Sequence, residues 1–315
     1  MGVTFLGEKL PPQTNIMKKE LTTSTGGLLL VLTGATLISF SPIWVKIAHV
    51  GPTTAAFYRT FLGGIILAAV VLIRRPHPWP SRRQWGIGTL CGFLFALDLA
   101  LWHFGVKMAE PGLATILTNF QVFLMAAWGV LVFKERLTWR LVVSIPLALL
   151  GLTFLVGIRW QSLGQNFQIG IISSLSAAVA YTAYLLVLRR TRVGSNAIPP
   201  TVIMAMVSIT SAAFSTLGVV AAHESFAVPD LTTWGALIIY GVCSQVIGWV
   251  LISIGLPRIE ASRAGLVLLL QPALAFTWDV LFFKHGASAS EIIGAAIALT
   301  AIYMGLTGRS PERKK

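Results

Sequence analysis

Ten apolar stretches divide this chain, and the gaps between them alternate between many and few Lys and Arg residues. With a rise of about 1.5 Å per residue, a helix of about 20 residues crosses a hydrocarbon core of ~30 Å. The stretches start near Gly27, Thr53, Gly86, Gly112, Trp139, Gln168, Thr201, Trp234, Ser262 and Ser290. The pattern predicts a polytopic membrane protein with ten spans.

The distribution of basic residues predicts the orientation of these spans. Assigning the gaps alternately to two sides places 19 of the 24 Lys and Arg residues on the side that holds both ends of the chain. The other side receives Lys46, Lys107, Arg159 and Lys284, and Arg59 alone lies inside a stretch. Short loops rich in Lys and Arg stay in the cytoplasm during insertion. We therefore expect both termini in the cytoplasm.

Composition narrows the fold class and the partners. Of the residues, 55% are hydrophobic and 11% are charged, and the stretches lack the alternation of barrel strands, so the predicted fold class is all-α. The net charge of +13 does not predict nucleic-acid binding, because the basic residues lie in short loops at span ends. Orientation and attraction to anionic lipid account for this charge, so membrane lipids are expected partners.

The chain contains an internal repeat. At an offset of 150, residues 105–135 match residues 255–285 at 10 of 31 positions. The identities include Gln121 with Gln271, Trp128 with Trp278 and Lys134 with Lys284. Shared apolarity does not explain matches of this kind. Each half then holds five helices, and because five is odd, the second half enters the membrane from the opposite side.

The predicted organisation is ten transmembrane helices in two inverted five-helix repeats. We expect a flexible cytoplasmic tail over 1–25, a first repeat over 26–160, a second repeat over 161–308 and a basic cytoplasmic tail over 309–315. Inverted repeats are typical of secondary transporters, whose substrate site lies near the midplane and is exposed alternately to the two faces.

Two ionisable side chains inside spans are candidates for function. Asp98 lies about midway along the third stretch, where a charge costs roughly 2.5 to 3.5 kcal/mol, so it should face a cavity or a partner. It could carry a coupling proton, bind a substrate ammonium group, or form a structural polar contact. Arg59 could pair with Asp98, face an anionic substrate group, or extend to the outer headgroups.

Aromatic and amide side chains at helical spacing complete the candidate set. The candidate substrate-binding residues are Asp98, Trp102, Asn119, Tyr181, Gln245 and Trp249. Trp102 follows Asp98 by four residues, and Trp249 follows Gln245 by four, so the members of each pair share a helix face. Aromatic walls with a few polar groups often line small-molecule sites, although each residue taken singly could also be packing.

Other polar and small residues suggest gates and packing. Gln121 and Gln271 could hydrogen-bond between helices or form pseudo-symmetric gates. Gly294 and Ala298 favour close helix packing, and Pro42 predicts a bend in the first span.

Motifs of catalysis are absent. The chain has no phosphate-binding GxxxxGK[ST] loop, no HExxH or GxSxG motif and no Cys/His set with metal-ligand spacing. We therefore predict no enzyme, no catalytic residue, no metal site and no cofactor. Two hypotheses from other classes stay open: a membrane enzyme acting on lipid-linked substrates, and a non-transporting membrane scaffold.

The ends of the repeats resemble the EamA-type members of the drug/metabolite transporter superfamily. The resemblance is carried by Pro111 to Leu117 with the FKERLT run at 133–138, by 261–272 running to Phe283, and by the AFYR run at 56–59. It covers residues 27–306. In two places the chain departs from the family pattern: Gln121-Val122 stands where many members have proline, and Lys284-His285 replaces a Glu-containing ending.

This resemblance implies a carrier in a bacterial inner membrane, with a central cavity lined by the first, third, fourth, sixth, eighth and ninth spans. Together with the repeat, it predicts a secondary transporter, an exporter of small amino-acid-like or amphipathic metabolites that works by alternating access. The expected partners are the small-molecule substrate and protons as a candidate coupling ion.

Overall fold

The computed structural model describes residues 13–75, 79–108, 111–156, 167–193, 197–283 and 288–307, and these residues form helices and connecting loops without strands. The first repeat comprises α1 (Gln13–Ser39), α2 (Ser41–Ile47), α3 (Pro52–Arg74), α4 (Arg82–Met108), α5 (Pro111–Thr118), α6 (Gln121–Leu131) and α7 (Trp139–Val156). The second comprises α8 (Phe167–Arg190), α9 (Pro200–Ala221), α10 (Leu231–Tyr240), the π-helix η2 (Gly241–Gly248), α11 (Trp249–Gly255), the short η3 (Leu256–Arg258), α12 (Ala261–Leu268), α13 (Leu270–Phe283) and α14 (Ala289–Thr307).

These helices confirm the prediction of an all-α membrane protein with ten spans. Nine apolar segments of the described chain are long enough to cross a membrane, and the shorter apolar helix Trp139–Leu155 supplies the tenth. Several of the spans consist of two or more helices in succession; the eighth, for example, contains α10, η2 and α11.

The amino-terminal helix begins earlier than expected. We expected a tail through residue 25, but α1 starts at Gln13. The segment from Met17 to Leu21 consists of Met, Lys, Glu and Leu, which favour helix, so the apolar span extends backward as one helix. Residues 1–12 and the basic tail at 309–315 lie outside the described residues.

The repeat is also visible in the interruptions of the helices. The fourth span breaks between α5 and α6 at 119–120, and the ninth breaks between α12 and α13 at Leu269, 150 residues later. Gln121 opens α6, and Gln271 is the second residue of α13. In the first span, Pro42 lies in the first turn of α2, where the missing N–H costs no helical hydrogen bond. Broken helices are typical of transporter cores.

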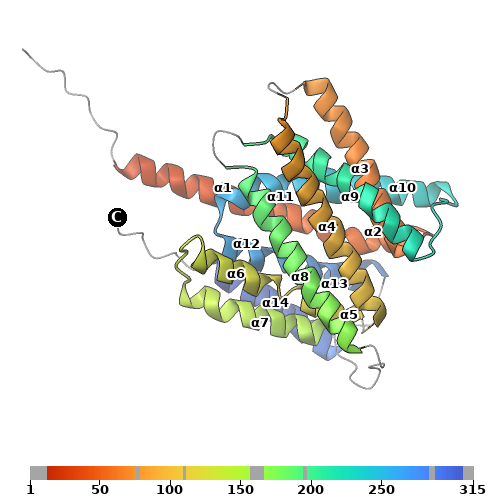
Figure 1. Ribbon diagram of the computed structural model, residues 1–315. Coiled ribbons are helices and arrows are strands. Elements are labelled where there is room, and N and C mark those ends of the chain that lie inside the picture. The colour runs from red at the N-terminus through yellow and green to blue at the C-terminus, as the bar shows by residue number, and fades with distance from the viewer. Residues whose placement is uncertain are drawn as a thin grey trace, which may run out of the picture.

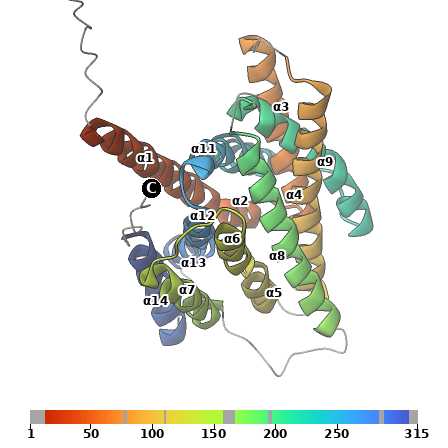
Figure 2. The ribbon, with the colours of Figure 1, turned by 60° about the vertical axis from the view of Figure 1, so that its left-hand side comes forward.

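Helices at equivalent positions of the two repeats pack against each other. The pairs are α3 with α9, α6 with α12, and α7 with α14. Figures 1 and 2 show α7 and α14 side by side. Two further contacts are related by the repeat. The third span of the first repeat packs on the first span of the second, as α4 on α8, and the third span of the second repeat packs on the first span of the first, as α11 on α1. This exchange of partners is the arrangement that two inverted repeats produce.

Glycine residues allow the backbones of α7 and α14 to approach each other closely. A Cβ atom added to Gly151 would lie 2.5 Å from the backbone nitrogen of Ala298 and 2.7 Å from the carbonyl oxygen of Gly294. A Cβ atom on Gly294 would likewise lie 2.6 Å from the carbonyl oxygen of Gly151. The small residues predicted to permit close packing therefore do so here.

One carboxylate joins the two repeats at the end of the molecule that we expect, from the charge pattern, to face the cytoplasm. Glu135, which follows α6, accepts hydrogen bonds from the backbone N–H groups of Ala261 and Ser262 at 2.6 and 3.1 Å. It also accepts one from the Ser262 hydroxyl at 2.8 Å. Because helix-terminal N–H groups lack partners within their own helix, Glu135 caps α12 from the other repeat. We call this contact the inner latch.

A second carboxylate joins the repeats at the opposite end. Glu224, which follows α9, accepts hydrogen bonds from the backbone N–H groups of Thr53 and Thr54 at 3.2 and 2.7 Å, and so caps α3. Burial by itself would raise the pKa of Glu224, but the hydrogen bonds from these two residues outweigh it and hold the pKa below its usual value. We call this contact the outer latch.

We predict that Gly151→Ala destabilises the protein by about 1–3 kcal/mol, because its methyl group meets backbone atoms that cannot rotate away. Thermal unfolding of the purified protein in detergent measures this loss. The control is Gly86→Ala in α4, where the added Cβ meets nothing within 4 Å. Equal unfolding temperatures for Gly151→Ala and the wild type would contradict the packing argument.

We predict that Glu224→Gln lowers stability at neutral pH by about 1 kcal/mol, the usual cost of losing a helix cap. A carboxylate whose pKa is depressed on folding stabilises the protein above its unfolded pKa of about 4.5, and this contribution disappears as the pH falls through the folded value. The difference between variant and wild type should therefore be constant from pH 6 to 8 and shrink below about pH 4. Unfolding midpoints measured across this range test the prediction, and a difference that stays constant down to pH 3 would contradict it.

Candidate functional site

A chain of buried polar side chains crosses from the first repeat to the second. Nε of Arg59 in α3 donates to Oε1 of Gln245 at 3.1 Å, and Nη1 donates to the Tyr240 hydroxyl at 3.4 Å. Nε2 of Gln245 donates in turn to the Ser208 hydroxyl at 2.9 Å. All four residues are less than a tenth exposed. The Arg59 guanidinium is thus held inside the protein and does not extend to the headgroups.

The π-helix η2 makes this chain possible. Tyr240 and Gln245 are five residues apart, the spacing of one π turn, so both can face the same guanidinium. Gly63 of α3 permits the approach, because a Cβ atom there would lie 2.7 Å from the Cβ of Gln245. Single π turns occur frequently at functional sites.

Four aromatic side chains pack beside the polar chain. The ring centroids of Phe95, Tyr184 and Trp249 lie 4.9 to 5.3 Å apart, and Tyr181 lies 6.3 Å from both Tyr184 and Trp249. The Arg59 guanidinium carbon lies 5.3 Å from the centroid of the Phe95 ring, which favours a cation–π contact. The polar chain and the aromatic group therefore form one unit, contributed by α3, α4, α8, α9 and the eighth span.

Asp98 belongs to this unit but lacks a hydrogen-bond partner on one oxygen. It lies one turn after Phe95 in α4, is 7% exposed, and leaves Oδ1 unpartnered within the described part of the chain. Arg59 and Tyr181 are in electrostatic range of the carboxylate, but the hydrogen bonds of Arg59 go to Gln245 and Tyr240. Within the described residues, Asp98 and Arg59 therefore do not form the ion pair that we considered. One oxygen of the Asp98 carboxylate could accept a hydrogen bond from a ligand at membrane depth.

We refer to the polar chain, the aromatic group and Asp98 together as the central cluster. It consists of Arg59, Phe95, Asp98, Tyr181, Tyr184, Ser208, Tyr240, Gln245 and Trp249. Several of its polar atoms are buried and have no hydrogen-bond partner among the described residues, and the same holds for polar atoms of the two repeat-matched glutamines. They are Oδ1 of Asp98, the Tyr184 hydroxyl, Nε1 of Trp249, Oε1 of Gln121 and Nε2 of Gln271. Unpaired polar atoms in an apolar interior are costly, and a polar ligand would satisfy them.

Each of the repeat-matched glutamines contacts a helix of the other or the same repeat, and the two have different partners. Nε2 of Gln121 donates to the carbonyl oxygen of Gly265 in α12 at 3.3 Å, so it forms the predicted interhelical contact. The Gln271 side chain lies within hydrogen-bonding reach of the Tyr181 hydroxyl. Gln271 therefore adjoins the central cluster, and Gln121 ties the two broken helices together. Whether either residue gates transport stays a prediction.

Two predicted residues contact other neighbours. The Asn119 side chain donates to the carbonyl oxygen of Thr115 at 2.8 Å, because the break after α5 leaves that carbonyl near the helix end. Trp102 packs edge to face against His103, with ring centroids 4.8 Å apart. Their part in substrate binding stays a prediction.

Some residues of the central cluster were missed at the sequence level. Phe95 precedes Asp98 by three residues and so shares its helix face, and this spacing in the sequence could have identified it. Ser208 is one of several small polar residues in an apolar run, and nothing in the sequence distinguishes it. Tyr240 joins Gln245 only through a π turn, which helical periodicity of 3.6 does not predict.

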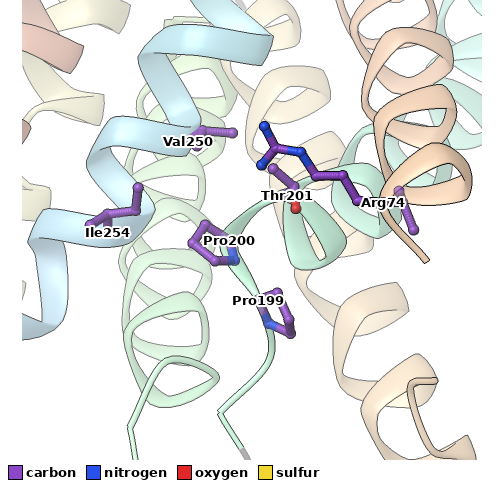
Figure 3. Close-up of a pocket in the computed structure, with 7 residues that line it drawn as sticks. Arg74, Pro199, Pro200, Thr201, Val250 and Ile254 are labelled. Carbon is purple, nitrogen blue, oxygen red and sulfur yellow. The ribbon is translucent and has the colours of Figure 1, made fainter. Parts of the chain in front are cut away.

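Two cavities lie away from the central cluster, at helix ends. One of them, of about 390 Å³, lies between the end of α3, the start of α9 and α11. In Figure 3 the Arg74 side chain extends toward Val250 in this cavity. Its walls are largely apolar, and none of its residues belongs to the central cluster. The cluster itself is almost inaccessible, since eight of its nine residues are buried.

Comparison with known proteins agrees with this fold. The sequence profile of the EamA-like transporter family matches the chain twice, over residues 25–157 and 168–307. An uncharacterized transporter of Bacillus subtilis is 23% identical over 312 residues, which cover 95% of this chain and 97% of the relative. A probable amino-acid metabolite efflux pump of Salmonella typhimurium is 24% identical over 279 residues, which cover 86% and 91%.

A solved crystal structure has the same fold, with a TM-score of 0.76 and 19% identity over 89% of this chain and 98% of that one. The family and the names of the relatives indicate a transporter rather than an enzyme. The two profile matches together cover most of the chain, and each covers one five-helix repeat. The chain therefore belongs to the EamA-like transporter family and is a multi-pass membrane transporter.

Proposed function

We propose that this transporter exports small amino-acid-like or amphipathic metabolites across a bacterial inner membrane by alternating access. The observation that carries the proposal is the central cluster: a closed site, built by both repeats, with unpaired polar atoms beside an aromatic wall. A site of this kind between inverted repeats suits a secondary transporter. The name of the Salmonella relative, a probable amino-acid metabolite efflux pump, supports the substrate class and the direction.

The chemistry of the cluster suggests how such a substrate is held. Oδ1 of Asp98 would accept a hydrogen bond from a substrate ammonium group, and the ring nitrogen of Trp249 and the hydroxyl of Tyr184 would donate to a carboxylate or carbonyl. The rings would enclose an apolar side chain, as in many small-molecule sites. Arg59 holds the wall in place through Gln245 and Phe95.

Asp98 is also the proposed coupling group. A buried carboxylate beside a guanidinium can bind a proton in one state and a substrate amine in another, and the two would compete for the same oxygen. Entry of a proton from outside would then release the amine, and departure of the proton toward the cytoplasm would reset the site. Protons are therefore the proposed coupling ion.

The latches supply a physical basis for alternating access. Each places a carboxylate of one repeat on the first turn of a helix in the other, at opposite ends of the molecule. Opening either end to a substrate would require the contact at that end to separate while the other holds. The bias of basic residues supports a cytoplasmic location for the inner latch and for both termini. Large apolar side chains such as Leu72, Ile73 and Leu217 are more than half exposed and would contact lipid.

We predict that Asp98→Asn reduces flux driven by a pH gradient at least tenfold, because an amide neither carries the proton nor compensates an ammonium charge. The measurement is efflux of labelled amino acids, tested one at a time, from proteoliposomes with imposed gradients. Asp279→Asn is the control, since Asp279 pairs with Lys46 away from the central cluster. Substrate recovered chemically unchanged separates transport from catalysis.

Unchanged proton-driven flux in Asp98→Asn would remove this residue from the coupling mechanism. Absence of saturable flux for every amino acid tested with the folded wild type would refute the proposed substrate class.

We predict that Glu224→Gln opens the site toward the outside and Glu135→Gln opens it toward the cytoplasm. Loss of a helix cap costs on the order of 1–2 kcal/mol, so the open population should rise about tenfold. The reporter is Ser208→Cys in a chain whose Cys91 and Cys243 are replaced by serine, labelled from either side with an impermeant maleimide. The control is Glu291→Gln, because this carboxylate accepts hydrogen bonds from the N–H and the hydroxyl of Ser288 and belongs to neither latch. Identical sidedness in the two latch variants would argue against the assignment.

A further inference from the structure

A second cavity, of about 420 Å³, lies away from the central cluster at helix ends that the charge pattern places in the cytoplasm. Five segments meet there: α1, the end of α6, the end of α8, η3 and the start of α12. The lining residues are Ser24, Phe133, Glu135, Arg189, Pro257, Arg258, Ile259, Glu260 and Arg263. Because these positions are span ends, the cavity lies at the level of the lipid headgroups. It holds three guanidinium groups and two carboxylates.

Both carboxylates already have partners. Glu135 accepts three hydrogen bonds from Ala261 and Ser262 in the inner latch. Glu260 forms an ion pair with Arg263, with Nε and Oε2 2.9 Å apart. The negative charges that line the cavity are thus occupied by α12 and by Arg263. Within the described residues, the remaining two arginines of the cavity form no ion pair with either carboxylate.

Those two arginines, Arg189 and Arg258, supply positive charge that the cavity does not neutralise by contact. The Arg189 guanidinium carbon lies 5.0 Å from the centroid of the Phe133 ring, which favours a cation–π contact. Nη1 of Arg189 is buried and has no hydrogen-bond partner among the residues that the structure describes, although Glu135 and Glu260 attract the group over a longer distance. Arg258 forms no ion pair within the described residues, and Arg192 adds a further positive charge near it. A buried guanidinium N–H without an acceptor indicates a missing anionic partner.

We propose that this cavity binds a phosphate group, held between Arg189 and Arg258. A guanidinium plane matches the oxygens of a phosphate, and one phosphate can accept hydrogen bonds from two such groups at once. The phosphate can come from the headgroup of an anionic phospholipid in the inner leaflet or from a free phosphate ester of the cytoplasm. The site adjoins Glu135, so its occupant would lie beside the inner latch.

The test is binding of inorganic phosphate to the full-length protein in nanodiscs of phosphatidylcholine. Phosphate is titrated against chloride at constant ionic strength, and the thermal unfolding midpoint is followed. We expect a saturable rise in the midpoint, because a ligand that binds only the native state stabilises it. Arg189→Gln and Arg258→Gln should each weaken the apparent affinity at least tenfold. The matched control is Arg190→Gln, since Arg190 is the exposed neighbour in α8 and does not line the cavity.

Nanodiscs containing phosphatidylglycerol distinguish the two sources. The site is assigned to a lipid headgroup if phosphatidylglycerol raises the unfolding midpoint and abolishes the response to added phosphate. Both of these effects must then require Arg189 and Arg258. An undiminished response to phosphate assigns it to a free phosphate. The proposal is overturned if neither phosphate nor phosphatidylglycerol shifts the midpoint, or if Arg258→Gln responds as the wild type does. Arg258→Gln alone suffices if Arg189→Gln fails to fold. The readout requires no transport, so it is independent of the proposed function.

Discussion

The hydrocarbon core offers no hydrogen-bond partner to a polar group, and the structure of this transporter depends on how its buried polar groups find partners in one another. Arg59 is the clearest case. Its guanidinium lies inside a span, where a lone charge is costly, and it is accommodated by Gln245 and Tyr240 of the opposite repeat and by the face of Phe95. The contacts that stabilise the Arg59 charge also hold the eighth span against α3 and α4. The interactions that accommodate this buried charge are therefore the ones that assemble the site.

Within the described residues, the polar atoms of the central cluster are not all satisfied by hydrogen bonds, and this supports the proposal that the cluster binds a substrate. Among the described residues, polar atoms of Asp98, Tyr184 and Trp249 have no hydrogen-bond partner, and the rings of Tyr184 and Trp249 pack against each other. A purely structural polar network would be expected to close its hydrogen bonds. Vacant donors and acceptors of both kinds, at one place, suit a zwitterionic or amphipathic guest better than they suit a stable apolar core.

The inverted repeat is visible in the helix pairs and in the matched breaks of the fourth and ninth spans, but the two latches are not images of each other. Glu135 follows the fourth span and caps the ninth. The residue that matches it, His285, lies outside the described part of the chain, and the carboxylate found at the outer end is Glu224, which follows the seventh span and caps the second. Two different helix pairs thus close the two ends. The hydrogen bonds at the two ends are therefore made by different residues and different helices, although the helix packing is nearly symmetric.

The sequence by itself determined the class of the protein: the number of spans, their helical nature, the repeat, and the residues of unusual polarity at membrane depth. These follow from span length, Lys and Arg distribution and the cost of burying charge, which are local properties of the chain. Only the tertiary structure decided which of those residues meet. Asp98, Tyr181, Gln245 and Trp249 come together, and Tyr240 joins them because the π-helix η2 brings it to the same guanidinium as Gln245. Asn119 instead donates to the carbonyl oxygen of Thr115, because the fourth span breaks after α5.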